Sequence, residues 1–142
     1  MSDFGLVVSG AMAVRQLVYI STASNLDAAE VERILEISRK NNAEAGISGF
    51  LLYNGRNFLQ LVEGEEQALT ALYDRLGSDP RHDGMVRLAD EPIAERSCPD
   101  WQMHQLRLAD DVIRRRELLM AELPDKLSRD IRQLVLNFAA LN

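Results

Sequence analysis

Residues 47–64 read ISGFLLYNGRNFLQLVEG, two apolar runs on either side of an Asn-Gly pair. Asn-Gly between two such runs is a strong signal for a β-hairpin, because both central residues of a type I′ turn need φ > 0. We therefore predict strands over 47–53 and 58–64, joined by a type I′ turn at Asn54 and Gly55. This hairpin gives two neighbouring strands of a sheet, and the other predicted elements are placed relative to it.

Gln60 lies in the middle of the second strand, where an aliphatic residue would be expected. Phe58 and Val62 share its face, and Leu59 and Leu61 point to the opposite face. Burying an amide without a partner costs about 1–3 kcal/mol, so a polar group of the protein or of a ligand should meet Gln60. Both faces of the strand are apolar, so both faces of the sheet must be covered. The C-terminal helices and a second subunit are the candidates for the second face.

The elements predicted from the rest of the chain follow the order βαββαββ and then two helices. In chain order they are a strand over 14–21, a helix that starts with a capping box at Asp27 and Glu30 and ends near 41–42, the hairpin, a helix over 65–77, strands over 85–89 and 101–106, and helices from 109 onward. This order predicts an α+β fold: a ferredoxin-like sheet with two helices on one face and the C-terminal helices on the other.

The chain of 142 residues is expected to form one folded domain over 14–108, with an N-terminal extension over 1–13 and a C-terminal helical cap over 109–142. The net charge is −6 and the basic residues are scattered apart from Arg114–Arg116, which argues against nucleic-acid binding. The sequence shows no signal peptide and no membrane span, and Cys98, its one cysteine, cannot form an internal disulfide. We therefore predict a cytoplasmic protein.

Polar or redox-capable side chains occupy four places that a purely structural protein would fill with aliphatic residues. They are Tyr19, Asn42, Gln60 and Trp101, and Met103 is expected on the same strand face as Trp101. Each also has a structural explanation. For Tyr19, a tyrosine in a strand packs its ring and exposes its hydroxyl to water, and for Asn42, an asparagine at a helix end is a cap. A hydrogen bond from Tyr19 would satisfy the Gln60 amide, and Trp101 with Met103 would fill part of a core.

Signals for enzymatic chemistry are missing from the sequence. Neither His82 nor His104 has metal-ligand spacing with other residues, the carboxylates form no catalytic pair, and no glycine-rich phosphate loop occurs. An acyl-phosphatase-like enzyme would need an arginine in the loop after the first strand, and residues 22–25 read TASN. The residues alone thus indicate a two-layer domain with a buried Tyr-Gln pair, and no enzyme and no metal.

Six motifs carry a further signal through their order and spacing: LVYIS at 17–21, NNA at 41–43, ISGFLLY at 47–53, FLQLVEG at 58–64, DPRH at 79–82 and WQM at 101–103. Together they resemble the BLUF family, sensors of blue light that use FAD. The resemblance covers roughly residues 14–108, about two-thirds of the chain.

The resemblance implies a flavin held between the two helices, over the sheet face of Tyr19 and Gln60. In such a sensor Tyr19 gives an electron to the excited flavin, and Gln60 bridges the tyrosine hydroxyl and the N5/O4 edge. Asn42 bonds the ring edge near O4 and N3. Other cofactor contacts implied by the resemblance are Asn41 near that edge, Ile34 and Leu76 against the ring, and Arg81 and His82 beside the ring or ribityl chain.

The resemblance also implies how the protein signals. Trp101 and Met103 occupy the position whose in-or-out state is linked to signalling. Asn41 departs from the histidine or arginine of some members. FMN or riboflavin could replace FAD.

We expect a stand-alone, non-enzymatic sensor that signals through a partner or its own oligomer. The alternative is a light-insensitive flavin-binding or interaction module on the same fold.

Overall fold

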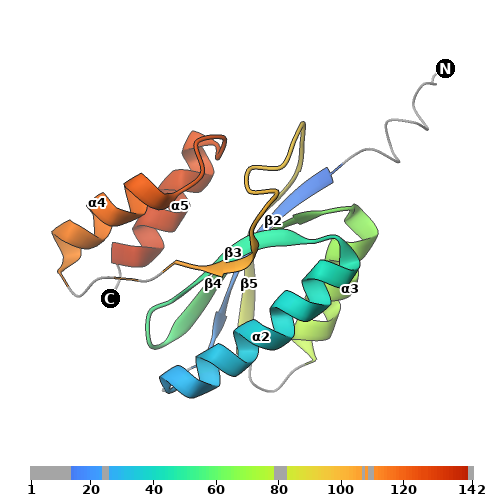
Figure 1. The fold of residues 1–142 in the computed structure, drawn as a ribbon, viewed down its shortest axis with the longest axis horizontal. Helices are drawn as coiled ribbons and strands as arrows, with labels where there is room; N and C mark the ends of the chain where they lie inside the picture. Colours follow the sequence, from blue (N-terminus) through green and yellow to red (C-terminus); the bar gives the residue numbers. More distant parts are fainter. Residues whose placement is uncertain (1–13, 24–25, 79–82, 107, 109–110, 141–142) are drawn as a thin grey trace.

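The computed structural model describes residues 14–140 apart from 24–25, 79–82, 107 and 109–110 (Figure 1). Its strands are β2 (Val14–Thr22), β3 (Ser48–Tyr53), β4 (Asn57–Gly64), β5 (Asp83–Ile93) and β6 (Gln102–Gln105). Its helices are α2 (Ala28–Ala45), α3 (Glu66–Gly77), α4 (Val112–Glu122) and α5 (Arg129–Ala140). The extension predicted over 1–13 lies outside the described residues.

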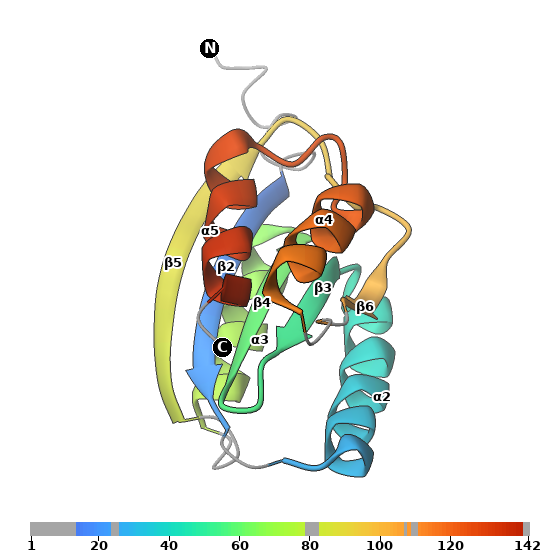
Figure 2. The ribbon, with the colours of Figure 1, turned by 90° about the vertical axis from the view of Figure 1, so that its left-hand side faces the viewer.

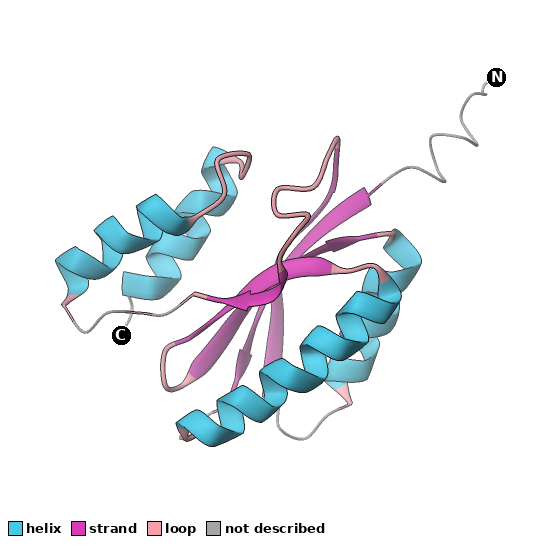
Figure 3. Ribbon diagram, in the orientation of Figure 1, coloured by secondary structure: helices cyan, strands magenta, loops and turns pink. Residues whose placement is uncertain are grey.

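The five strands form one sheet in the order β5-β2-β4-β3-β6. β4 lies between β2 and β3 and pairs antiparallel with both, β5 pairs antiparallel with β2, and β6 runs parallel to β3. This confirms the predicted ferredoxin-like βαββαββ arrangement. Figure 3 shows the sheet as a central layer with helices on each side.

One face of the sheet is covered by α2 and α3. Leu17, Val62 and Phe58 of the sheet pack there with Leu35 of α2 and Leu72 of α3 in a single buried cluster. The capping box at the start of α2 is present as predicted, with both of its hydrogen bonds made. The helix is longer than predicted: it runs on through 41–42 to Ala45 and stops where Gly46 adopts φ 72°, a left-handed conformation that glycine allows.

The opposite face is covered by α4 and α5, as Figure 2 shows from that side. Leu59 and Leu61 of β4 pack there with Leu119 of α4 and with Val135 and Phe138 of α5. The strand-face assignment made from the alternation is therefore confirmed. Of the two candidates for the second cover, this chain's own C-terminal helices fill the role.

The hairpin turn differs from the prediction. Three residues, Asn54 to Arg56, separate β3 from β4, and only Gly55 of the pair has a positive φ, 93°. Asn54 Oδ1 accepts hydrogen bonds from the amides of Arg56 (3.0 Å) and Asn57 (2.8 Å). The asparagine side chain thus satisfies the turn amides, and a type I′ backbone is not needed.

The two outer strands also differ in extent from the prediction. β5 extends beyond 85–89 to Asp83–Ile93 and includes Pro92, which is tolerated because β5 is an edge strand. β6 is shorter than 101–106, and its pairing with β3 shifts register between Gly49 and Phe50. No helix in the described part of the chain is both long and apolar enough to cross a membrane.

Candidate functional site

Tyr19 and Gln60 meet at the centre of the sheet. They lie directly opposite one another on β2 and β4, on the face covered by α2 and α3. The Tyr19 hydroxyl donates a hydrogen bond to Gln60 Oε1, and both side chains are buried. The polar partner predicted for Gln60 is therefore the phenol of the neighbouring strand.

Burial strongly favours the neutral form of the Tyr19 phenol. Removal from water raises its pKa well above the ordinary value, and neighbouring Tyr73 adds to the effect, while Arg75 opposes it. Tyr73 approaches edge-on, with 5.5 Å between the ring centroids, and the Arg87 guanidinium lies 4.5 Å from the centre of the Tyr73 ring. The phenol is thus a protonated hydrogen-bond donor packed against the Tyr73 ring.

Asn42 is the most unusual residue of this face. Val31, Ile34, Leu35 and Asn42 make up the buried side of α2, so an amide stands where the helix otherwise presents aliphatic side chains. Both its Nδ2 and its Oδ1 are buried, and neither has a hydrogen-bond partner among the residues that the structure describes. It is not a helix cap, because Gly46 ends the helix. An amide left without partners costs about 1–3 kcal/mol, so this pair of atoms points to a ligand that offers one acceptor and one donor.

The other residues predicted for the site are placed as follows. Ile34 is buried, and Leu76 is partly buried against the same cluster as Tyr19. Asn41 is half-buried beside Asn42 on α2. Arg81 and His82 lie outside the described residues. In the part of the chain that is described, no three potential metal ligands come together.

Trp101 and Met103 do not share a face, which corrects the prediction. Met103 is buried in the cluster of Tyr19, whereas Trp101 packs against the cluster under α4 and α5, with its ring edge-on to Phe50 at 5.9 Å. Met103 has φ 58°, a left-handed conformation that breaks the alternation of a regular strand. Trp101 and Met103 are only two residues apart, and their side chains therefore lie on opposite sides of the sheet.

Two further features near this site, Tyr73 and Glu63, were not predicted from the sequence. Tyr73 lies in the helix predicted over 65–77, and its spacing with Leu69 and Leu72 directs it toward the sheet. Glu63 lies near the end of the second hairpin strand, and its carboxylate is completely buried. Its position on the same strand face as Leu59 and Leu61 was the available signal.

These donors and acceptors fit a flavin. The Asn42 amide offers an NH2 donor group and a carbonyl oxygen, which match the alternating acceptor and donor of the flavin pyrimidine edge. The surrounding apolar residues suit a flat aromatic ring system. The site is therefore chemically suited to hold a neutral heteroaromatic group, with the Tyr19–Gln60 pair on the same face of the sheet.

Comparison with known proteins gives the same result. Residues 14–104 match the family described as BLUF, sensors of blue light using FAD. The β subunit of a photoactivated adenylate cyclase from Euglena gracilis is 34% identical over 93 residues, which is 63% of this chain and 11% of that protein. The chain thus spans about a tenth of the curated relatives it matches.

Solved structures agree. BlrB, a BLUF protein in its dark state, is 34% identical with a TM-score of 0.65, and the match covers 87% of this chain and 85% of that one. The BLUF domain of BlrP1 is 27% identical with a TM-score of 0.76, and the match covers 90% of each chain. The matched family consists of sensors, and its domain is not a catalytic unit. The chain belongs to the BLUF family of flavin-binding blue-light sensors.

Proposed function

We propose that this protein is a cytoplasmic blue-light photoreceptor that binds FAD non-covalently between α2 and α3. The observation that carries the proposal is the buried, unpaired amide of Asn42 in a face that also holds the Tyr19–Gln60 pair. Asn42 would bind the ring edge, with Asn41 close by, and Ile34 and Leu76 would pack against the ring. Arg81 and His82 are proposed to flank the ring or ribityl chain.

The photochemical step depends on the hydrogen bond between Tyr19 and Gln60. When bound, the flavin supplies blue-light absorption and an acceptor for one electron. Tyr19 gives up an electron and its hydroxyl proton, the proton passes along the existing bond toward Gln60 Oε1, and Tyr19 then recovers both. Gln60 is left rotated or in its other tautomer. Such a network makes a switch because each intermediate with a broken bond is penalised in a buried site.

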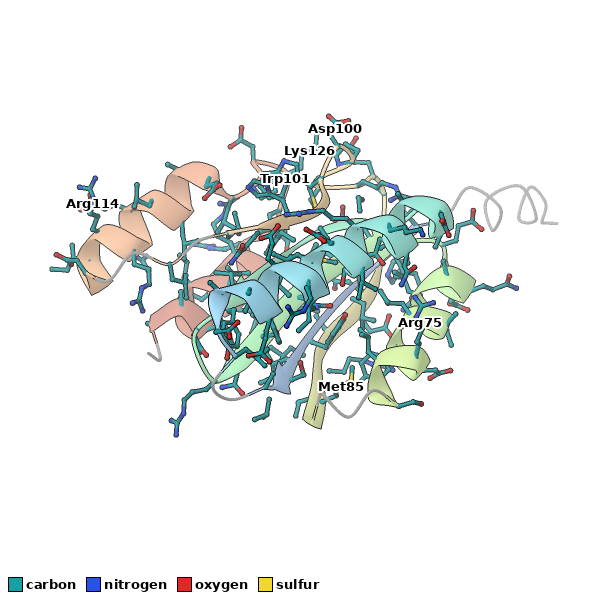
Figure 4. All side chains as sticks on the ribbon, turned by 60° about the horizontal axis from the view of Figure 1, so that its bottom comes forward. Arg75, Met85, Asp100, Trp101, Arg114 and Lys126 are labelled. Atoms are coloured by element: carbon teal, nitrogen blue, oxygen red, sulfur yellow. The ribbon has the colours of Figure 1, made fainter. Side chains whose placement is uncertain are left out.

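The signal is proposed to leave through Trp101 and Met103. Met103 contacts the cluster of Tyr19, and Trp101 contacts the cluster under α4 and α5, so a shift of β6 would reach both layers. Figure 4 shows Trp101 beside Asp100 and Lys126, far from Arg75 and Met85. A cleft lined in part by Trp101, Asp100 and Lys126 opens there.

The output is proposed to be a partner protein or the protein's own oligomer, with the sensor over 14–108 and the helical cap over 109–142 as separate functional parts. Relatives named as photoactivated adenylate cyclases carry their activity in much longer chains. A light-regulated adenylyl cyclase of bacterial origin matches over 34% of its chain. These relatives support coupling of a BLUF domain to an effector.

An absorbance measurement tests the proposal. The purified protein, loaded in separate samples with FAD, FMN or riboflavin, should be yellow and show a reversible red shift after blue light. A protein that takes up none of the three would overturn it. A protein that binds flavin but shows no shift would instead be the light-insensitive module. Trp101→Ala should keep the red shift and change dark recovery, whereas loss of flavin would make Trp101 part of the pocket.

A further inference from the structure

A buried polar row crosses the three central strands on the face of α4 and α5. Gln16 of β2 lies opposite Glu63 of β4, and Ser48 of β3 lies opposite Glu63 from the other side. All three side chains are buried, and Glu63 is completely inaccessible. The same face of the sheet holds Val18, Phe50 and Leu61, so the buried polar row lies at one end of an otherwise apolar surface.

The segment 96–98 lies on this row and is bonded to it. The Glu63 carboxylate accepts hydrogen bonds from the Ser97 amide (2.8 and 3.0 Å), the Cys98 amide (3.2 Å) and Gln16 Nε2 (2.8 Å). The Cys98 thiol also points to the carboxylate, with 3.6 Å between Sγ and Oε1. One buried carboxylate thus holds two consecutive backbone amides of a loop that is distant in sequence.

Arg96 binds the same segment to two strands and a helix. Its guanidinium donates to Ser48 Oγ (2.9 Å), to the Glu63 carbonyl (3.0 Å) and to the Gly46 carbonyl (2.7 Å). Gly46 ends α2, the helix of Asn42, and Glu63 is three residues beyond Gln60 on β4. The segment is therefore tied to the ends of both elements that carry the proposed flavin contacts.

Trp101 lies three residues after segment 96–98 and is bonded to it. Its amide donates to the Cys98 carbonyl (3.2 Å), and its own carbonyl accepts from the Gly49 amide (2.8 Å). Beyond it, β6 has four residues and an irregular register against β3. A firmly bonded segment thus leads into a short and irregular strand that carries Met103.

We propose that Glu63 and Arg96 are positioning residues: they fix segment 96–98 to the ends of β4 and α2 and so set where Trp101 and Met103 lie relative to Gln60. This inference rests on the proposed function for its link to light. Glu63 does not touch the flavin face, because it points to the opposite side of the sheet from Gln60. Both act only through the segment they hold.

Glu63→Gln is the sharpest test. Both carboxylate oxygens accept hydrogen bonds, so an amide nitrogen in place of either oxygen would face N–H groups. Bonds to a charged acceptor are strong enough that their loss should speed hydrogen exchange of the Ser97 and Cys98 amides roughly tenfold or more. The matched control is Glu65→Gln, which makes the same charge change at an exposed residue with no side-chain capping bond.

Four readouts are measured on the full chain. Exchange at the 97 and 98 amides and emission of Trp101, the one tryptophan of the chain, need no flavin. The loaded protein gives the size of the red shift and the rate of dark recovery. We expect Glu63→Gln to exchange faster, to shift the Trp101 emission, and to change dark recovery severalfold with the size of the red shift unchanged. Glu65→Gln should match the wild type in all four.

Arg96→Lys provides a second variant if Glu63→Gln does not fold. A compact ammonium cannot span the three acceptors of the guanidinium, so the same changes should occur to a smaller degree. Wild-type exchange, Trp101 emission and recovery in the folded variants would overturn the inference, as would lower stability with an unchanged recovery rate. If the wild type shows no light response but exchange and emission change as expected, the proposed function fails and the positioning role stands.

Discussion

Replacing Asn42 by leucine should change the stability of the flavin-free protein and its affinity for flavin in opposite directions. Both amide atoms are buried without partners, which costs the flavin-free fold about 1–3 kcal/mol. Asn42→Leu removes that cost, so the free energy of unfolding should rise by about this amount. For a chain of this size, the melting temperature should rise by about 3 °C for each kcal/mol.

The bound state should respond in the other direction. Two hydrogen bonds of about 0.5–1.5 kcal/mol each would be lost between Asn42 and the ring edge. The dissociation constant of the flavin should therefore increase by about 5-fold to 150-fold. Urea unfolding of the flavin-free protein and titration of flavin fluorescence measure the two effects separately.

Two controls distinguish a ligand-binding amide from a structural one. Asn42→Ala removes the same polar atoms without adding volume, and should also weaken flavin binding. Asn41→Leu makes the same exchange at the neighbouring half-buried position and should have a smaller effect on both quantities. A loss of stability in flavin-free Asn42→Leu and Asn42→Ala, with flavin affinity unchanged, would refute the reasoning.

The remaining predictions concern the photochemical pair, a close backbone contact and pH. Tyr19→Phe and Gln60→Leu should keep the flavin and abolish the red shift, measured as a light-minus-dark spectrum; a normal photocycle in either would remove its assigned role. Gly49→Ala should destabilise the fold by about 3 kcal/mol or more in urea unfolding, because its Cβ would lie 1.9 Å from the Leu61 carbonyl oxygen. Near-normal stability of this variant would show that β3 and β4 can separate locally. Burial raises the pKa of the Tyr19 phenol and of the Cys98 thiol above their ordinary values of 10.0 and 9.0, so the stability they contribute is intact below about pH 9 and is lost as pH rises. Tyr19→Phe should flatten the decline above about pH 10, and an identical decline in the variant would contradict the linkage.

Local rules were sufficient for the parts of the site that lie in regular elements. Strict alternation assigned Tyr19 and Gln60 to apolar strands, and the register of β2 against β4 then brought them together. The same rule failed for Trp101 and Met103, because it assumes a regular strand. A left-handed Met103 and a shifted register put the two side chains in different layers.

For Asn42, the rules for helix ends were not sufficient, for a different reason. Its sequence position near a glycine is typical of a helix cap, and helix-end rules allowed that explanation. Whether an amide is a cap or an unpaired buried group depends on how far the helix continues and on what surrounds it. The three extra residues up to Ala45 turned an expected end into an interior position.

The sequence by itself determined the order of elements, the two apolar faces of the hairpin and the family, because these follow from residue periodicity and from motifs at fixed spacing. The tertiary structure alone decided the burial of Glu63 and its contacts with Gln16 and segment 96–98. These contacts join residues more than thirty positions apart, and only the folded sheet brings them within hydrogen-bonding distance. A carboxylate at a strand end is ordinary in sequence, and it becomes a structural anchor when the surrounding chain excludes water and supplies donors.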